Sequence, residues 1–197
     1  MWWQVAELFH FAETAGAQIR LRDSDALSLT WDCGRSWQHV WNTSGEHAQA
    51  FYGESEYAET RVPTMISDYS GLMLNWAVLR IGRKARFYKG WEAIRVPASA
   101  QSVDPRWGFE QLTLITGRLT RDGKPVPMQL RTIFPDHYEL NQFSHVAGMR
   151  FKDLLAAFKD PTGGILANWV EPAPSSERPQ GAETVSYTHL RAHETVL

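Results

Sequence analysis

The stretch TWDCGRSW, residues 30–37, directly follows the alternating run ALSL and is the most informative local pattern in the chain. It places two hydroxyls, an aspartate, a glycine and a tryptophan at fixed offsets, as Thr30, Asp32, Gly34, Ser36 and Trp37. Glycine adopts backbone conformations that strain other residues, and short polar side chains hydrogen-bond the N–H groups of a turn. Trp37 can fold back over the turn as an apolar plug. We therefore expect a β-hairpin turn with a structural role, rather than a catalytic loop or a metal site.

Short runs typical of β-strands make up most of the chain around this turn. They alternate apolar with polar residues or are rich in β-branched and aromatic residues, and Gly, Pro, Asp and Ser separate them. These runs are AQIRLR, ALSLTW, GLMLNWAVLRI, ARFYKGWEAIRV, FEQLTLITGRL, VPMQLRTIF and HYELNQF. In FKDLLAAFKD, residues 151–160, apolar residues instead recur at helical spacing, which predicts one short helix that ends before Pro161. The chain is therefore predicted to be all-β apart from this helix and a short helix or strand at its start.

Two other patterns are interpreted as turns. TRDGKPV, residues 120–126, contains the Asp-Gly pair that favours a hairpin turn. GRKAR, residues 82–86, concentrates basic residues and is expected to form a turn in a solvated loop.

The composition is that of an ordinary domain able to bury a core. The 197 residues are 43% hydrophobic and carry a formal net charge of −2. The 20 basic residues are scattered, which excludes the usual footprint of a nucleic-acid binder or a protein of anionic membranes. A single cysteine, Cys33, excludes an internal disulfide framework and a cysteine-rich zinc site. We expect no nucleic acid or membrane as partner, no metal and no cofactor.

Internal similarity suggests a repeated unit. SHVAGMRF, residues 144–151, fits the frame of the opening stretch, and FYKGW keeps its glycine and aromatic residue. Gly90 follows Gly34 by 56 residues, and Gly148 follows Gly90 by 58. GLMLNWAV from Gly71 and GILANWVE from Gly164 also agree without gaps. A period of this length is typical of a four-stranded propeller blade.

On these motifs the sequence resembles the sialidase-like β-propellers that carry Asp-box repeats. The box is TWDCGRSW, and RVPTMISDYSGLMLNWAVLR is similar to the family's Arg-Ile-Pro strand, with Arg61 in the arginine position. The resemblance covers roughly residues 26–151. It implies a partial β-propeller of about three four-stranded blades that binds or cleaves a carbohydrate. It also implies that Arg61, with Arg80 on the same stretch, binds the substrate, because guanidinium groups grip carboxylates bidentately.

The sequence departs from that family where catalysis would be expected. The acid/base aspartate that should follow Arg61 is lacking in IGRKARFYKGWEAI. Tyr69, Tyr88 and Tyr138 have no identifiable glutamate partner that would make one of them a nucleophile. The catalytic residues are therefore unknown, and glycoside hydrolase activity of the exo-sialidase type stays open.

A second interpretation belongs to a different class. GRLTRDGKPVPMQLRTIFPDHYELNQF forms a long hairpin pattern with apolar alternation, which suits a closed lipocalin-like β-barrel. Such a barrel would bind a small apolar ligand and catalyse nothing. It would also leave no sheet edges exposed, whereas three blades would.

The chain divides into three parts by composition. Residues 1–171 form the β-rich domain, residues 172–184 are a Pro- and Ser-rich loop or linker, and residues 185–197 form a tail. Within that tail, VSYTHLRAHET resembles a translated sequencing adaptor of the kind found in metagenomic fragments, so we expect the natural chain to continue past about Thr184.

Overall fold

A computed structural model describes residues 2–23, 26–44, 48–56 and 62–171. The predicted linker, residues 172–184, and the predicted tail, residues 185–197, lie outside the described residues, and a domain boundary at residue 171 stays a prediction. The helices are α1 (Trp2–Glu13), α2 (Ser70–Tyr88), α3 (Tyr138–Val146) and α4 (Phe151–Lys159), with 3₁₀ turns η1 (Asp32–Gly34), η2 (Ala100–Ser102) and η3 (Gly164–Trp169). The strands are β1 (Gln18–Asp23), β2 (Ala26–Trp31), β3 (Ser36–Asn42), β4 (Ala50–Glu56), β5 (Pro63–Ser67), β6 (Ala93–Ile94), β7 (Gly108–Thr113), β8 (Thr116–Arg121), β9 (Lys124–Pro125), β10 (Met128–Arg131) and β11 (Val170–Glu171).

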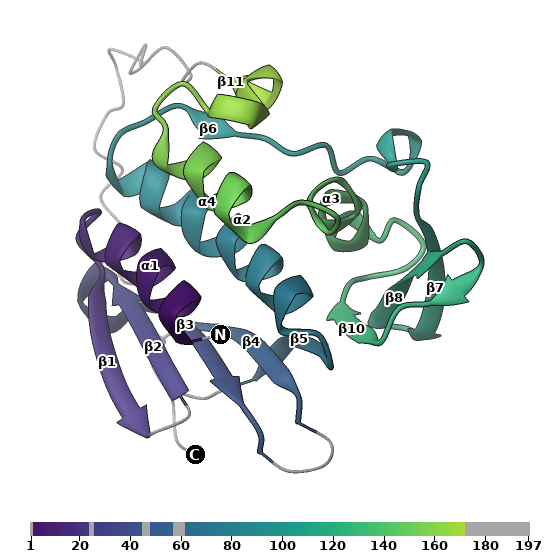
Figure 1. The fold of residues 1–197 in the computed structure, drawn as a ribbon, viewed down its shortest axis with the longest axis horizontal. Coiled ribbons are helices and arrows are strands. Elements are labelled where there is room, and N and C mark those ends of the chain that lie inside the picture. Colours follow the sequence, from purple (N-terminus) through teal and green to yellow (C-terminus); the bar gives the residue numbers. More distant parts are fainter. Residues whose placement is uncertain (1, 24–25, 45–47, 57–61, 172–197) are drawn as a thin grey trace, which may run out of the picture.

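Among the described residues, nine strands form one antiparallel sheet. Its order is β1-β2-β3-β4-β5-β10-β8-β7, with β9 paired to β8, while β6 and β11 form a separate pair. Strands β1 to β5 follow one another as a meander, and β10 continues the sheet beside β5. The β7–β8–β10 part lies to one side of the meander, with α3 packed against it (Figure 1).

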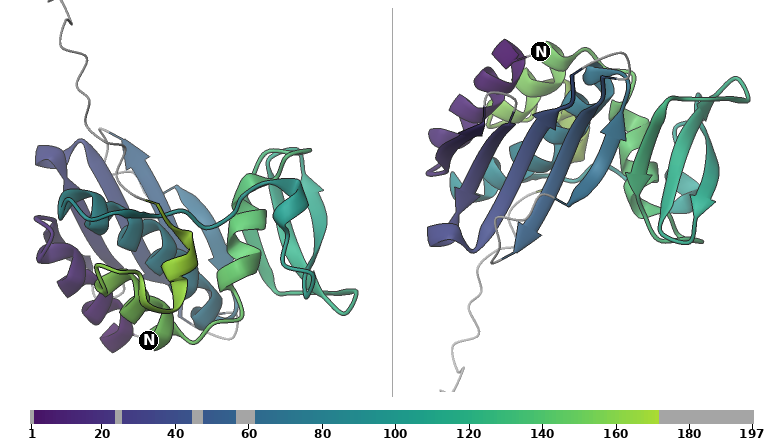
Figure 2. Two further views of the ribbon diagram at one scale, coloured as in Figure 1. Left: turned by 90° about the horizontal axis from the view of Figure 1, so that it is seen from above. Right: turned by 90° about the horizontal axis from the view of Figure 1, so that it is seen from below.

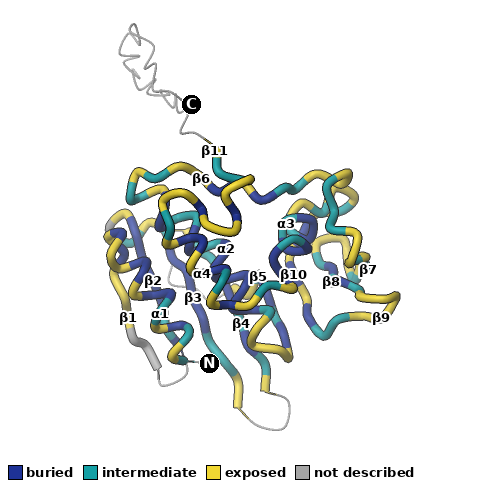
Figure 3. Tube along the Cα trace, turned by 45° about the horizontal axis from the view of Figure 1, so that its top comes forward, coloured by how far each residue is buried: buried dark blue, intermediate teal, exposed yellow. Residues whose placement is uncertain are grey.

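Helices α1, α2 and α4 cover one face of the meander (Figure 2). The sheet presents Leu29, Val40, Tyr52 and Met65 to the core. Buried residues are concentrated where this helical layer meets the strands, and the loops are exposed (Figure 3). Within the part of the chain that the structure describes, none of the helices is long and apolar enough to cross a bilayer.

Helix α2 is the central element of the helical layer. It contacts β4 and β5 on one side and α1, α3 and α4 on the others. Seven consecutive residues, Met73 to Leu79, are buried because neighbours surround the helix. Where neighbours surround a helix it shows no polar stripe, so residues 73–79 form an apolar run interrupted by Asn75 alone, and periodicity cannot distinguish this run from a buried strand. The strand expected for GLMLNWAVLRI is therefore wrong.

Other local expectations had mixed outcomes. The helix expected at FKDLLAAFKD is confirmed as α4. The strand expected at HYELNQF is wrong, because these residues lie in or next to α3. The loop expected at GRKAR is also wrong, because residues 82–86 lie inside α2 and Arg86 is fully buried.

The all-β fold class is supported only roughly, because the described residues form an antiparallel sheet together with four α-helices. The lipocalin-like barrel is wrong, because the described strands form an open sheet with β1 and β7 at its two ends. The sheet is also continuous, with no division into four-stranded blades among the described residues. The supposed repeat fails for a physical reason. Gly34 lies in the β2–β3 turn, Gly90 follows α2, and Gly148 lies between α3 and α4.

Candidate functional site

A cavity of about 610 Å³ opens at one end of the helical layer. We call it the α2 cleft. Its walls come from the β3 and β4 ends, from the second half of α2 and from β6. They are formed by residues 36–38, 54–56 and 93–95 together with Arg80, Arg83, Lys84 and Phe87.

Strand alternation explains why the cleft is polar while the neighbouring core is apolar. Residues two apart on a strand face the same side of a sheet. Val40 pairs with Tyr52 in the buried middle of β3 and β4, and one step along the same face Gln38 pairs with Glu54. The core-facing row of these two strands therefore changes from apolar to polar at the point where the cleft begins.

Helix spacing supplies the opposite wall. One face of α2 carries four side chains, because three of them lie three, four and seven residues after Arg80. They are Arg83, Lys84 and Phe87. Two of these basic residues, Arg83 and Lys84, belong to the GRKAR stretch that was interpreted as a solvated turn in the sequence. Once the segment is known to be helical, their spacing instead predicts one charged face.

Arg80 and Glu54 form a bidentate pair across the cleft. Arg80 Nε donates to Glu54 Oε1 at 2.8 Å, and its Nη2 donates to Oε2 at 2.7 Å. Tyr52 Oη donates to the same carboxylate at 2.7 Å. Burial alone would raise the pKa of Glu54, but the hydrogen bonds and charge of Arg80, with Tyr52 and Gln38, lower it below its ordinary value of 4.5. Both members of the pair are therefore held charged and fixed in position.

Burial also raises the pKa of Tyr52 well above its ordinary value, and the charge of Glu54 acts in the same direction. Tyr52 consequently remains a hydrogen-bond donor to Glu54. This arrangement gives the Glu54 carboxylate a structural role at the floor of the cleft.

Lys84 is held between the sheet and the helical layer. Its ammonium group contacts Ser36 Oγ and lies 5.3 Å from the centroid of the Trp31 ring. Burial lowers the pKa of Lys84, while the negative charges of Asp32 and Glu54 oppose that shift. The cation is thus already engaged by the protein.

Arg83 differs from these two cations. It is half-buried, and its Nη1 donates a long hydrogen bond of 3.5 Å to Gln142 Oε1. Burial lowers the pKa of Arg83, and the nearby positive charges of Arg80 and Arg95 lower it further. Arg95, which is exposed, pairs with Glu171 at 2.5 Å. Among the described residues, no salt bridge satisfies Arg83.

The residues singled out in the sequence fall partly in this cleft. Thr30, Asp32, Gly34, Ser36 and Trp37 lie at the β2–β3 turn, where Asp32 has φ +52° and Gly34 φ +91°. Trp37 Nε1 donates to Gly34 O at 2.7 Å and so folds back over the turn. Ser36 and Trp37 also line the cleft.

The two arginines expected to bind substrate have different outcomes. Arg80 lies in the cleft, but the carboxylate that it holds belongs to Glu54 of the same chain. Arg61 lies outside the described residues. Sequence reasoning missed Glu54, Arg83 and Arg95, because their roles depend on which strand and helix meet.

A second surface feature lies in the β7–β8–β10 part. Leu114, Ile115, Ile133 and Tyr138 are exposed large apolar residues, and we call them the apolar edge. The two segments are adjacent, because the N–H of Thr132 donates to Ile115 O at 3.0 Å. Exposed apolar groups of this kind also occur at protein interfaces, so the edge is an alternative contact surface.

The side chains of the cleft are suited to recognising a charged group. No cluster of three or more His, Cys, Asp or Glu side chains able to hold a metal ion occurs among the residues that the structure describes. What the cleft offers is a fixed ion pair, an engaged lysine and a half-buried arginine with no carboxylate partner in the described chain.

Comparisons with known proteins give one family and one similar fold. A family model described as "Immunity protein 61" matches residues 11–164. A solved structure, Rv3902c from M. tuberculosis, is similar with a TM-score of 0.63 and 14% sequence identity, covering 81% of this chain and 91% of that chain. At this identity the likeness concerns the fold alone. A search of curated proteins finds no match.

These findings overturn the resemblance to sialidase-like propellers. The matching family is one of immunity proteins, so the expected glycosidase function and the expected carbohydrate partner are wrong. The Asp-box pattern misled because its residues satisfy the demands of a hairpin turn, and those demands are the same in any antiparallel sheet. A short turn motif therefore identifies a turn and not a family.

Proposed function

Since the chain belongs to the immunity protein 61 family, we propose that it protects a cell by binding a toxin protein and keeping that toxin inactive. The observation that carries this proposal is the family match over residues 11–164, which includes every element that forms the α2 cleft. Immunity proteins typically bind a cognate toxin, so the expected partner is a protein.

The α2 cleft is the surface that we propose for toxin binding. Arginine and aromatic residues are enriched at protein interfaces, and complementary charge gives an interface its specificity and association rate. The cleft combines Arg80 and Arg83 with Phe87, whose side chain is 75% exposed. Because Glu54 holds Arg80 in place before any partner arrives, little side-chain entropy is lost there on binding.

An immunity protein that keeps its toxin inactive by binding to it needs no catalytic step of its own. It requires a tight complex, because each unbound toxin molecule remains active. A dissociation constant near 1 nM corresponds to about −12 kcal/mol, which specific protein interfaces of ordinary size commonly reach.

Co-expression with a toxin tests this proposal. A cell that makes the toxin needs protection at the same time, so candidate toxins are taken from reading frames next to this chain's gene. We expect growth arrest by one toxin, restoration of growth when the full chain is co-expressed, and a stable complex of the two purified proteins. Arrest by an unrelated toxin should not be relieved.

The proposal is wrong if the neighbouring toxin arrests growth regardless of this chain and the two purified proteins elute separately at micromolar concentration. Arg150→Gln serves as a surface control. Arg150 is exposed, lies outside the cleft and pairs locally with Asp153. This variant should protect as well as the wild type.

A further inference from the structure

The α2 cleft holds a cation, Arg83, that forms no salt bridge among the described residues, although the charge of Glu54 partly offsets those of Arg80 and Arg95. Glu54 neutralises Arg80 at 2.7 Å, and Glu171 neutralises Arg95 at 2.5 Å. Arg83 has no such carboxylate among the described residues, and it donates a long hydrogen bond to the uncharged side-chain amide of Gln142. The two charged neighbours that act on it most strongly are other arginines.

This arrangement is unfavourable for folding alone. Removing a guanidinium from water costs free energy that only a charge partner or several hydrogen bonds recover. A methionine or leucine at the same half-buried position of α2 would avoid that cost. Local features that oppose stability are expected where a site serves binding. Arg83 is therefore better explained by a group that enters the cleft than by the fold.

The side chains that line the cleft indicate which kind of anion would bind at Arg83. A guanidinium forms paired hydrogen bonds with a carboxylate, as Arg80 already does with Glu54. Glu54 and Glu56 line the same cleft and would repel a group carrying two negative charges. A singly charged carboxylate fits better than a phosphate.

The rim of the cleft suits a side chain attached to a protein. Phe87 is on the same face of α2 as Arg83, one turn further along, and is largely exposed. An aspartate or glutamate that enters the cleft would place its charge at Arg83 and its neighbouring apolar groups against Phe87. The volume of about 610 Å³ admits several side chains of a loop.

We propose that Arg83 binds an acidic side chain of the toxin, an aspartate or glutamate that enters the α2 cleft beside Phe87. This inference rests on the proposed function, because it names the group that the partner contributes to the same site. In this scheme Arg80 remains paired with Glu54, and Arg83 makes the contact.

Affinity measurements on the full chain and its toxin test the contact. Arg83→Gln is expected to weaken toxin binding roughly 30-fold or more, the effect of losing an interface hot spot. Arg150→Gln, the exposed arginine outside the cleft, should bind as the wild type does. Raising the salt concentration should weaken wild-type binding more than binding by Arg83→Gln, because salt screens the pair that the variant lacks.

A stability measurement separates binding from folding. Arg83→Met should keep or raise the urea midpoint of unfolding, since it removes a half-buried charge without a carboxylate partner in the described chain, yet it should lose toxin affinity as Arg83→Gln does. A fall in both properties would mean that Arg83 supports the fold, which would overturn the proposal.

Charge reversal identifies the partner group. Arg83→Glu should abolish binding of the wild-type toxin. A toxin in which one acidic residue is changed to arginine should then bind the Arg83→Glu variant but not the wild-type chain. Equal binding of one toxin by the wild type, Arg83→Gln and Arg83→Glu would overturn the carboxylate contact and leave the proposed function intact. Failure of the wild type to bind its toxin would instead refute the proposed function.

Small probes test the site without a toxin. In the full chain, the Arg83 Nε–H resonance should shift on titration with acetate and respond less to inorganic phosphate. No shift with either probe would overturn the anion site. A stronger response to phosphate would show that the cleft takes a phosphorylated ligand, which contradicts the proposal of a carboxylate.

Discussion

At the scale of residues, three arginines of α2 have different roles although each is three positions from the next. Arg80 holds a carboxylate, and Arg83 has none among the described residues. Arg86 is fully buried and donates hydrogen bonds to the backbone carbonyls of residues 92, 158, 160 and 161, which joins α2 to the end of α4. Composition and spacing could not distinguish the three, because the difference arises from what packs against each turn of the helix.

The Arg80–Glu54 pair predicts a stability that depends on pH. The pKa of Glu54 is lowered in the folded protein, so its stabilising effect is present above its ordinary value of 4.5 and is lost as the pH falls through the lowered value. We expect Glu54→Gln to reduce the free energy of unfolding at neutral pH by about 1–3 kcal/mol. The difference from the wild type should shrink in acid. Urea denaturation at a series of pH values measures it.

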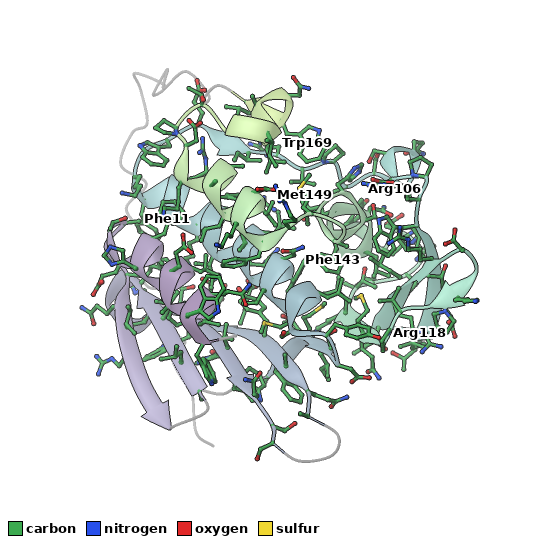
Figure 4. The ribbon with its side chains drawn as sticks, in the orientation of Figure 1. Phe11, Arg106, Arg118, Phe143, Met149 and Trp169 are labelled. Carbon is green, nitrogen blue, oxygen red and sulfur yellow. The ribbon has the colours of Figure 1, made fainter. Side chains whose placement is uncertain are left out.

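The matched control is Glu110→Gln. Arg118 holds Glu110 with the same bidentate geometry, at 2.8 Å for both bonds, and Figure 4 places Arg118 at the periphery of the β7–β8 part. Since the Glu110 side chain is 42% exposed against 28% for Glu54, solvent screens its charge more, and the control should change stability less. Equal effects of the two substitutions, or a Glu54→Gln effect that persists unchanged into acid, would contradict the role given to the cleft pair.

At the scale of elements, the sequence predicted local turns better than it predicted helices. ALSLTW became β2, and the Asp-Gly pair of TRDGKPV forms the β8–β9 turn, with positive φ at Asp122 and Gly123. Such turns depend on adjacent residues alone. Helix α2 could not be recognised, because it is buried on several sides. Helix α3 was missed as well. Its Phe143, labelled in Figure 4, packs edge-to-face on Trp76 of α2 with ring centroids 5.7 Å apart, a contact between distant segments that local patterns do not reveal.

Close packing of α2 on α4 gives an element-scale prediction. A Cβ at Gly82 would lie 2.7 Å from Cγ and Cδ1 of Phe158, so Gly82→Ala forces the two helices apart. Overpacking costs about 1–3 kcal/mol, which exceeds the gain of about 1 kcal/mol in helix propensity. We expect the thermal midpoint of unfolding to fall.

Gly71→Ala in the same helix is the control. A Cβ at Gly71 meets no atom within 4 Å, so this variant should gain up to about 1 kcal/mol from helix propensity. If both variants shift the midpoint in the same direction, the close contact between α2 and α4 is not the cause.

At the scale of the whole molecule, one open sheet with helices on one face brings together residues that are distant in sequence. The α2 cleft joins β3, β4, α2 and β6, and β10 pairs with β5 across a long separation in the chain. Local patterns do not specify such pairings, which is why the turn at residues 30–37 could be predicted and the cleft beside it could not. The same architecture places the apolar edge on the separate β7–β8–β10 part.

Oxidative footprinting of exposed side chains, in the free full-length chain and in its complex with the toxin, tests most directly whether the toxin binds at the α2 cleft. Phe87 reports on the cleft, and Leu114 and Tyr138 report on the apolar edge, since all three are well exposed. The account predicts that toxin binding slows oxidation of Phe87 and leaves Leu114 and Tyr138 unchanged. Slower oxidation of Leu114 and Tyr138 with no change at Phe87 would contradict it.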